Sequence, residues 1–164
     1  MAKTIEPGDI IFCERGLYAH FGIYVGDLNV IHFAGDVIDK FMGENVPEIK
    51  LTDIEEFKGT DALYTITAEH LLSMIDDTTP FEEGRYQFYS AEKTVERAYE
   101  RLYAPISENY DLFGNNCEHF AVWCKTGLNT SQQVTNLNNL LDGEFLDVGL
   151  SLLNIAFYQE EAVY

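Results

Sequence analysis

Two β-rich runs on either side of a short turn are the feature that most restricts how this chain can fold. Residues 18–25 and 30–34 are rich in aromatic and β-branched side chains, and Gly-Asp-Leu-Asn lies between them at 26–29. Such runs around a Gly-Asp turn predict a β-hairpin. Antiparallel pairing is therefore the expected pattern for the sheet that contains these strands.

Further short apolar runs predict more strands, and helical patterns follow them along the chain. The additional strands are expected at residues 10–13, 48–51 and 62–66, with a turn at 58–61. Ser90 is a good N-cap for a helix over 91–103. A capping box at 130–133 predicts another helix that reaches residue 141. Strands first and helices later indicate an α+β fold, an antiparallel sheet packed on helices.

A separate helical pattern begins at Cys117. Apolar residues recur from there at steps of three and four, Asn116 is a good N-cap, and Gly127 closes the segment. The first helical position favours negative charge, because unpaired N–H groups and the helix dipole act there. We therefore expect a lowered pKa for Cys117, which would make its thiol a nucleophile. The alternative is a buried cysteine that only packs.

A thiolate nucleophile needs a base nearby, and the predicted hairpin carries two histidines, His20 and His32. A two-residue loop would pair Ile23 with His32 and put the two rings on opposite faces of the sheet. A three-residue loop, or an equivalent bulge, would pair Gly22 with His32 and put both rings on one face. The hypothesis of a thiol–imidazole site requires the second arrangement.

The sequence gives less support to other roles for the histidines and Cys117. A single strand histidine is more often structural than catalytic. His119 lies two residues after Cys117, about 200° around a helix, so we expect it to face away from the thiol. A zinc site from Cys117, His20 and His32 has the right residue types but none of the usual short ligand spacings. The sequence has no G-x-S-x-G elbow and no phosphate-binding glycine loop.

Net charge and composition restrict the binding partners and the cellular compartment that we expect for the protein. The formal net charge is −18 at pH 7, which repels nucleic acid, so nucleic acid is not an expected partner. Three cysteines form no even framework, which fits a reducing compartment. There is no signal peptide pattern, and no apolar run approaches the roughly 20 residues of a membrane-spanning helix. We expect a cytoplasmic protein.

Four stretches in a fixed order carry a family resemblance. They are Pro-Gly-Asp-Ile-Ile at 7–11, Tyr-Ala-His-Phe-Gly-Ile-Tyr-Val-Gly at 18–26, Val-Ile-His-Phe-Ala at 30–34 and Asn-Cys-Glu-His-Phe at 116–120. Together they resemble the lecithin:retinol acyltransferase family, whose wider relatives include small phospholipase/acyltransferases and viral H-box/NC-box proteins. The resemblance implies a catalytic domain over residues 1–130 with a circularly permuted papain/NlpC-like cysteine hydrolase fold. Residues 131–164 would form a C-terminal helical extension.

The resemblance also implies a role for each site residue. Cys117 would be the nucleophile, His20 the base and His32 the residue that orients the base. Tyr18 would line the substrate site. The implied reaction is acyl transfer from a glycerophospholipid through a cysteine thioester, without a metal or cofactor.

Two other functions remain open from the sequence. One is a protein that keeps the fold without turnover and acts by binding partners, as the viral relatives suggest. The other is a peptidase or amidase of the NlpC type. For the acyltransferase, the partners would be the phospholipid substrate and the membrane surface, and residues 148–158 are the candidate amphipathic contact for peripheral binding.

Overall fold

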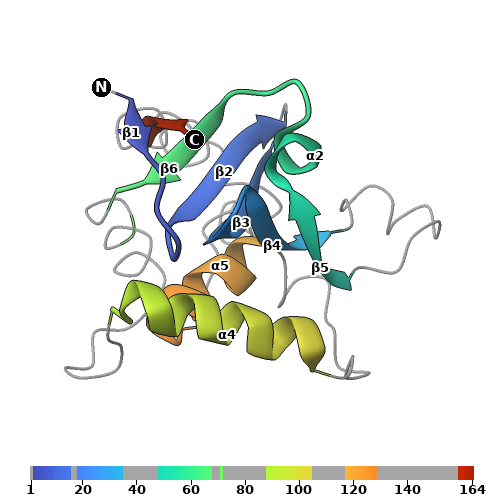
Figure 1. The fold of residues 1–164 in the computed structure, drawn as a ribbon, viewed down its shortest axis with the longest axis vertical. Coiled ribbons are helices and arrows are strands. Elements are labelled where there is room, and N and C mark those ends of the chain that lie inside the picture. The colour runs from blue at the N-terminus through green and yellow to red at the C-terminus, as the bar shows by residue number, and fades with distance from the viewer. Residues whose placement is uncertain are drawn as a thin grey trace, which may run out of the picture.

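The structure is a computed structural model that describes residues 2–15, 18–34, 48–67, 71, 88–104, 117–128 and 159–164. Within these ranges the chain forms a seven-stranded sheet with three helices around it (Figure 1). The strands are β1 (Lys3–Thr4), β2 (Ile10–Arg15), β3 (Tyr18–Gly26), β4 (Asn29–Ala34), β5 (Glu48–Asp53), β6 (Leu63–Ile66) and β7 (Gln159–Val163). The helices are α2 (Ile54–Lys58), α4 (Ala91–Tyr103) and α5 (Cys117–Thr126).

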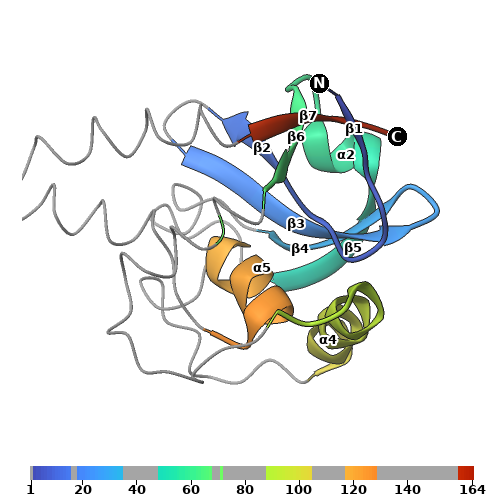
Figure 2. The same ribbon diagram turned by 90° about the vertical axis from the view of Figure 1, so that its left-hand side faces the viewer.

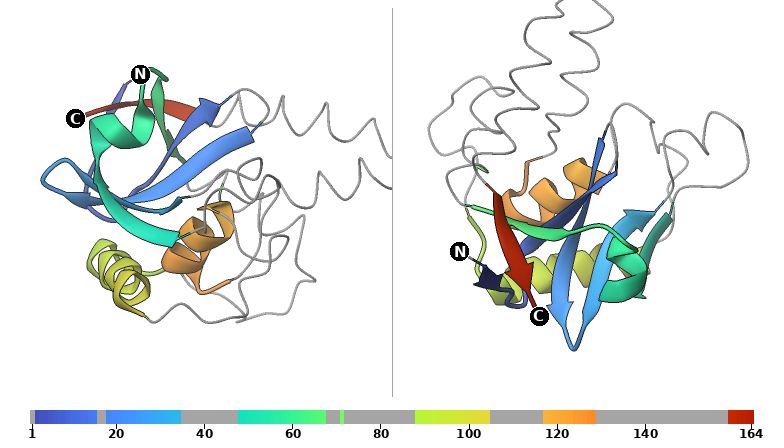
Figure 3. Two further views of the ribbon diagram at one scale, coloured as in Figure 1. Left: turned by 90° about the vertical axis from the view of Figure 1, so that its right-hand side faces the viewer. Right: turned by 90° about the horizontal axis from the view of Figure 1, so that it is seen from above.

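The sheet has the order β1-β7-β6-β2-β3-β4-β5. All neighbouring strands pair antiparallel except β1 and β7, which are parallel. The chain ends therefore meet in one sheet, and β7 lies between β1 and β6 (Figure 3). The α+β class and the mainly antiparallel sheet predicted from the sequence are confirmed.

The helices cover both faces of the sheet. Helices α4 and α5 pack on one face, against β3 and β4, whereas α2 packs on the other, against β4 and β5 (Figure 2). Side chains alternate along a strand, so each face has its own core. On β3, Ala19, Phe21 and Ile23 belong to the core beneath α5. The ring of His20 lies on the other face, 5.0 Å from the ring of Phe57 in α2.

The hairpin turn decides which residues of β3 and β4 face each other. Asp27 and Leu28 both have positive φ, 50° and 60°, as in a two-residue type I′ turn. Such a turn alone would pair Ile23 with His32. The register shifts between Tyr24 and Gly26, however, so that Gly22 lies opposite His32. This bulge is the equivalent of a three-residue loop, and it gives the register that the hypothesis of a thiol–imidazole site requires.

Local signals explain the predicted helices. Helix α4 has the predicted bounds, and the Ser90 hydroxyl accepts a hydrogen bond from the backbone N–H of Lys93 at 3.2 Å. Helix α5 begins at Cys117, also as predicted. Three elements were not predicted, namely β1, α2 and β7. Helix α2 is capped by Asp53, whose side chain accepts from the N–H of Glu55, and β1 and β7 lie near the two ends of the described chain.

Parts of the sequence prediction lie outside the described residues, namely the helix expected over 130–141 and the amphipathic stretch 148–158. Residues 159–163 of the expected C-terminal extension form β7, which pairs with β6. Within the described ranges, no helix combines the length and the apolar character needed to cross a membrane.

Candidate active site

The hairpin brings the two predicted histidines into direct contact. Nε2 of His20 lies 2.9 Å from Nδ1 of His32, and the ring centroids are 4.9 Å apart in an edge-to-face arrangement. The contact follows from the register, because Gly22 is opposite His32 and His20 is its diagonal neighbour on the same face. Both rings are buried.

Gly22 makes room for this pair. A Cβ atom at residue 22 would lie 2.6 Å from Cγ1 of Val30, 3.0 Å from a ring carbon of Phe57 and 3.2 Å from Cβ of His32. Phe57 in turn packs on both imidazoles, with ring centroids 5.0 Å from His20 and 5.1 Å from His32. The absence of a side chain at Gly22 therefore allows the Phe57 ring to pack on both imidazoles.

A third polar group continues the line of contacts. Nε2 of His32 lies 3.0 Å from Oγ1 of Thr52, a buried residue of β5. Thr52 was not predicted as a site residue, because its closeness to His32 depends on the pairing of β4 with β5, in which Thr52 lies opposite Val30. Only an alternating pattern in this strand could have hinted that Thr52 points inward.

Burial keeps both imidazoles neutral. It lowers the pKa of His20 to about 3, and the positive charges of Arg15 and Lys50 act in the same direction. Burial likewise lowers the pKa of His32 to about 3, with His20, Lys50 and Arg15 as smaller contributors. At pH 7 each ring therefore carries one N–H and one unprotonated nitrogen.

Cys117 is the first residue of α5 and is buried against β3. Its Sγ lies 3.7 Å from the carbonyl oxygen of Ala19, to which the thiol donates. Burial raises the pKa of the Cys117 thiol to about 12, although backbone N–H groups, including that of Phe21, favour the thiolate. The sequence expectation of a lowered pKa is thus wrong for this state, because loss of hydration outweighs the helix N-terminus.

The thiol of Cys117 contacts the backbone of β3 at the two residues that flank His20, through the carbonyl oxygen of Ala19 and the N–H of Phe21. Ala19, the acceptor for the thiol, immediately precedes His20, and their side chains point to opposite faces. Among the described residues, no hydrogen bond joins Sγ of Cys117 to either imidazole. Tyr18, the first residue of β3, pairs with Arg15 of β2.

Cys13 is a second thiol near the histidine pair, and no sequence pattern indicated this position. It lies directly opposite His20 in the pairing of β2 with β3, on the face that α2 covers. Its Sγ is 3.9 Å from the carbonyl oxygen of Phe57, and burial raises its pKa. Among the described residues, no group of three or more His, Cys, Asp or Glu side chains is arranged to hold a metal ion.

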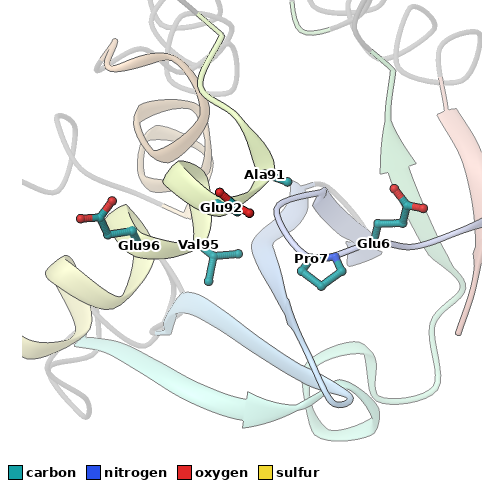
Figure 4. A pocket seen from close by; sticks show the side chains of 6 residues that line it. All are labelled: Glu6, Pro7, Ala91, Glu92, Val95 and Glu96. Atoms are coloured by element: carbon teal, nitrogen blue, oxygen red, sulfur yellow. The ribbon is translucent and has the colours of Figure 1, made fainter.

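A pocket of about 650 Å³ lies elsewhere, between the segment before β2 and the first turns of α4 (Figure 4). Its lining residues are Glu6, Pro7, Ala91, Glu92, Val95 and Glu96. None of the predicted site residues lines it. Its carboxylates would repel the phosphate of a phospholipid, so this pocket is a poor candidate for lipid binding.

The chain is similar in sequence to one family model and to several proteins named phospholipase A and acyltransferase. Residues 3–130 match the family model described as Lecithin retinol acyltransferase. The chain is 30% identical to Phospholipase A and acyltransferase 1 of Mus musculus, over 78% of this chain and 72% of the mouse protein. It is 27% identical to Phospholipase A and acyltransferase 3 of Homo sapiens, over 92% of this chain and 87% of the human protein.

A third relative is longer than this chain. Egg-laying defective protein 26 of Caenorhabditis elegans is 28% identical over 82% of this chain, and the match spans only 43% of the nematode protein. The family match covers most of the present sequence and includes the hairpin, α4 and α5. The chain therefore belongs to the lecithin retinol acyltransferase family.

Proposed function

We propose that this protein is a cysteine-dependent acyltransferase and phospholipase A that acts on the acyl esters of glycerophospholipids. Sγ of Cys117 attacks the ester carbonyl and forms a carbon–sulfur bond. The thiol proton passes to Nδ1 of His20 and then to the leaving lysophospholipid oxygen as the carbon–oxygen bond breaks. Water or an acceptor hydroxyl or amine next takes the acyl group and restores the thiol.

The observation that carries the proposal is the combination of a family match with one local arrangement. Cys117 opens a helix beside the residue that precedes His20, and His20 is held by His32. The relatives named above as phospholipases and acyltransferases support an acyl ester as substrate. The N–H groups at the start of α5 are suitable donors for a tetrahedral oxyanion.

The reaction requires a change in the contacts of Cys117. Sγ must leave the carbonyl oxygen of Ala19 and come within hydrogen-bonding distance of Nδ1 of His20, the next residue of β3. Because the thiol and the imidazole are both neutral in the described state, His20 acts as a general base during attack. We propose that contact with a phospholipid surface drives this rearrangement.

Two further parts of the proposal concern fold and location. The order of the elements, with the histidine strands before the cysteine helix, supports a circular permutation of the papain/NlpC-like fold. A substrate that resides in bilayers supports peripheral work at a membrane surface, and the odd number of cysteines supports a cytoplasmic location. Tyr18, at the start of β3, is proposed to line the acyl site.

The test is to trap the thioester. The protein is incubated with vesicles of phosphatidylcholine that carries a labelled acyl chain, quenched in acid, and examined by intact mass and peptide mapping. We expect one acyl group on Cys117 and release of labelled fatty acid. Cys117→Ala abolishes both, whereas Cys124→Ala, which removes another buried thiol of α5, retains both. Absence of an adduct and of fatty acid on neutral and anionic phospholipids would overturn the proposal and leave a binding protein.

A further inference from the structure

Three buried polar side chains form a continuous line beneath α2. Nε2 of His20 is 2.9 Å from Nδ1 of His32, and Nε2 of His32 is 3.0 Å from Oγ1 of Thr52. The three residues come from three neighbouring strands, β3, β4 and β5, and each is buried. Among the described residues, Nδ1 of His20 has no hydrogen-bond partner, so the line ends at the nitrogen to which the proposed function assigns the thiol proton.

The line can be hydrogen-bonded in only two ways while both rings are neutral. In the first, the Nε2–H of His20 donates to Nδ1 of His32, and the Nε2–H of His32 donates to Thr52. In the second, the Thr52 hydroxyl donates to Nε2 of His32, and the Nδ1–H of His32 donates to Nε2 of His20. The two arrangements give opposite chemistry at His20, because Nδ1 accepts a proton in the first and already carries one in the second.

The first arrangement is favoured by elementary chemistry. It puts both rings in the Nε2–H tautomer, which is the more stable form of neutral histidine in water, whereas the second puts both in the less stable form. Thr52 permits this arrangement because its hydroxyl oxygen can accept.

We propose that Thr52 is a positioning residue that fixes the tautomer of His32 and, through it, makes Nδ1 of His20 a proton acceptor. Without an acceptor at residue 52, the Nε2–H of His32 would be buried against hydrocarbon. The lower-energy alternative is to move that proton to Nδ1, from which it donates to His20. His20 must then carry its own proton on Nδ1. One lost hydroxyl therefore changes the tautomers of both rings.

The tautomer assignment depends on geometry, and its consequence for catalysis rests on the proposed function. The tautomers and the catalytic rate are therefore measured in separate experiments. Protein labelled with ¹⁵N-histidine is examined at pH 7 by long-range ¹H–¹⁵N correlation spectra, which distinguish protonated from unprotonated ring nitrogens. Variants at His70 and His119 assign the remaining two rings. Because burial lowers the pKa of both His20 and His32 to about 3, both are neutral under these conditions.

For the native protein we expect an unprotonated Nδ1 and a protonated Nε2 in both rings. Thr52→Val reverses the assignment in both, and Thr52→Ser, which keeps the hydroxyl, retains the native pattern. Thr94→Val is the matched control, because it also removes a buried hydroxyl, one that donates to the carbonyl oxygen of Ser90 at 2.8 Å. It should leave both rings unchanged. A protonated Nδ1 on His20 in the native protein overturns the inference even if the Thr52→Val variant does not fold.

The kinetic arm uses the same variants with labelled phosphatidylcholine. Loss of the general base lowers kcat about 100-fold in Thr52→Val, the low end of what such catalysis contributes, with little change in KM and recovery in Thr52→Ser. Reversed tautomers without any turnover in the native protein would sustain the tautomer assignment and overturn the proposed function. Turnover with tautomers unchanged in Thr52→Val would overturn the role of Thr52 alone.

Discussion

The carbonyl oxygen of Ala19 lies 3.7 Å from Sγ of Cys117, so the thiol at the start of α5 contacts the backbone of β3, the strand that carries His20. Burial raises the pKa of the Cys117 thiol to about 12, so the thiol is protonated at pH 7, and its acceptor Ala19 is the residue before His20. This arrangement differs from a site in which a thiolate and an imidazolium form an ion pair at rest. The difference has measurable consequences for the reactivity of the thiol.

We expect slow alkylation of Cys117 in the native protein. Burial raises its pKa to about 12, so little thiolate exists at neutral pH, and the rate with iodoacetamide should rise steadily between pH 7 and pH 9. Mass spectrometry of the labelled peptides gives the rate for each cysteine. Addition of phospholipid vesicles should accelerate Cys117 selectively over Cys124. Rapid labelling at pH 6 without lipid would contradict the described state.

Stability should fall on acidification because three described histidines, His20, His32 and His119, are buried in neutral form. His20 and His32 each have a pKa of about 3 when folded and near 6.5 when unfolded, so unfolding takes up protons below pH 6.5. The stabilisation that depends on neutral His20 and His32 is therefore complete above pH 6.5 and is lost as the pH falls toward 3. The free energy of unfolding should drop by about 1.4 kcal/mol per pH unit for each histidine.

Urea unfolding at several pH values between 7 and 4.5 measures this slope. Replacing one histidine of the pair, as in His32→Asn, should roughly halve the part of the slope that the pair supplies, whatever its effect on stability at pH 7. An unchanged slope would show that the protons are taken up elsewhere.

Gly22→Ala should destabilise the protein by about 1–3 kcal/mol, the usual cost of overpacking. The new methyl group would lie 2.6 Å from Cγ1 of Val30 and 3.0 Å from the Phe57 ring. In the double variant with Val30→Ala, part of the clash is relieved, so the two effects should be less than additive. Urea midpoints give both values, and simple additivity would exclude a direct clash.

Arg97 should be hard to replace, because it joins α4 to α5. Its guanidinium lies 3.7 Å from the ring centre of Trp123 and 4.5 Å from that of Tyr89, and it donates to the carbonyl oxygen of Trp123. Arg97→Lys loses the planar stacking and should cost about 1–2 kcal/mol.

Arg101→Lys is the control for Arg97, because Arg101 contacts only the Trp123 ring among these groups, at 4.3 Å. It should cost about 0.5 kcal/mol. Thermal unfolding compares the two, and equal effects would argue against the stacking account.

Much of the fold could be predicted because its signals are local. Ser90 marks the start of α4 through a side chain that caps the first turn. Asn116 as a predicted N-cap, together with the apolar periodicity, predicts Cys117 as the first residue of α5. The hairpin was evident from β-branched and aromatic runs around a turn. Helix α2 had a comparable signal in Asp53, but the run of strands and a predicted turn obscured it.

The site was only partly accessible to the same reasoning. The sequence left two hairpin registers open, and the bulge between Tyr24 and Gly26 selected the one that joins His20 to His32. No local pattern indicated that Thr52 would meet His32, or that Cys13 would lie opposite His20. These neighbours come from different strands, so their closeness depends on how the whole sheet pairs.

The amino-acid sequence by itself determined the family, the element types and the residues available for chemistry, because motif order, periodicity and capping act over a few residues. Only the tertiary structure decided the ionisation of those residues. A helix N-terminus favours a thiolate at Cys117, but burial against Ala19 removes the water that would solvate it. Desolvation is a property of everything packed around a group, and no short stretch of sequence contains it.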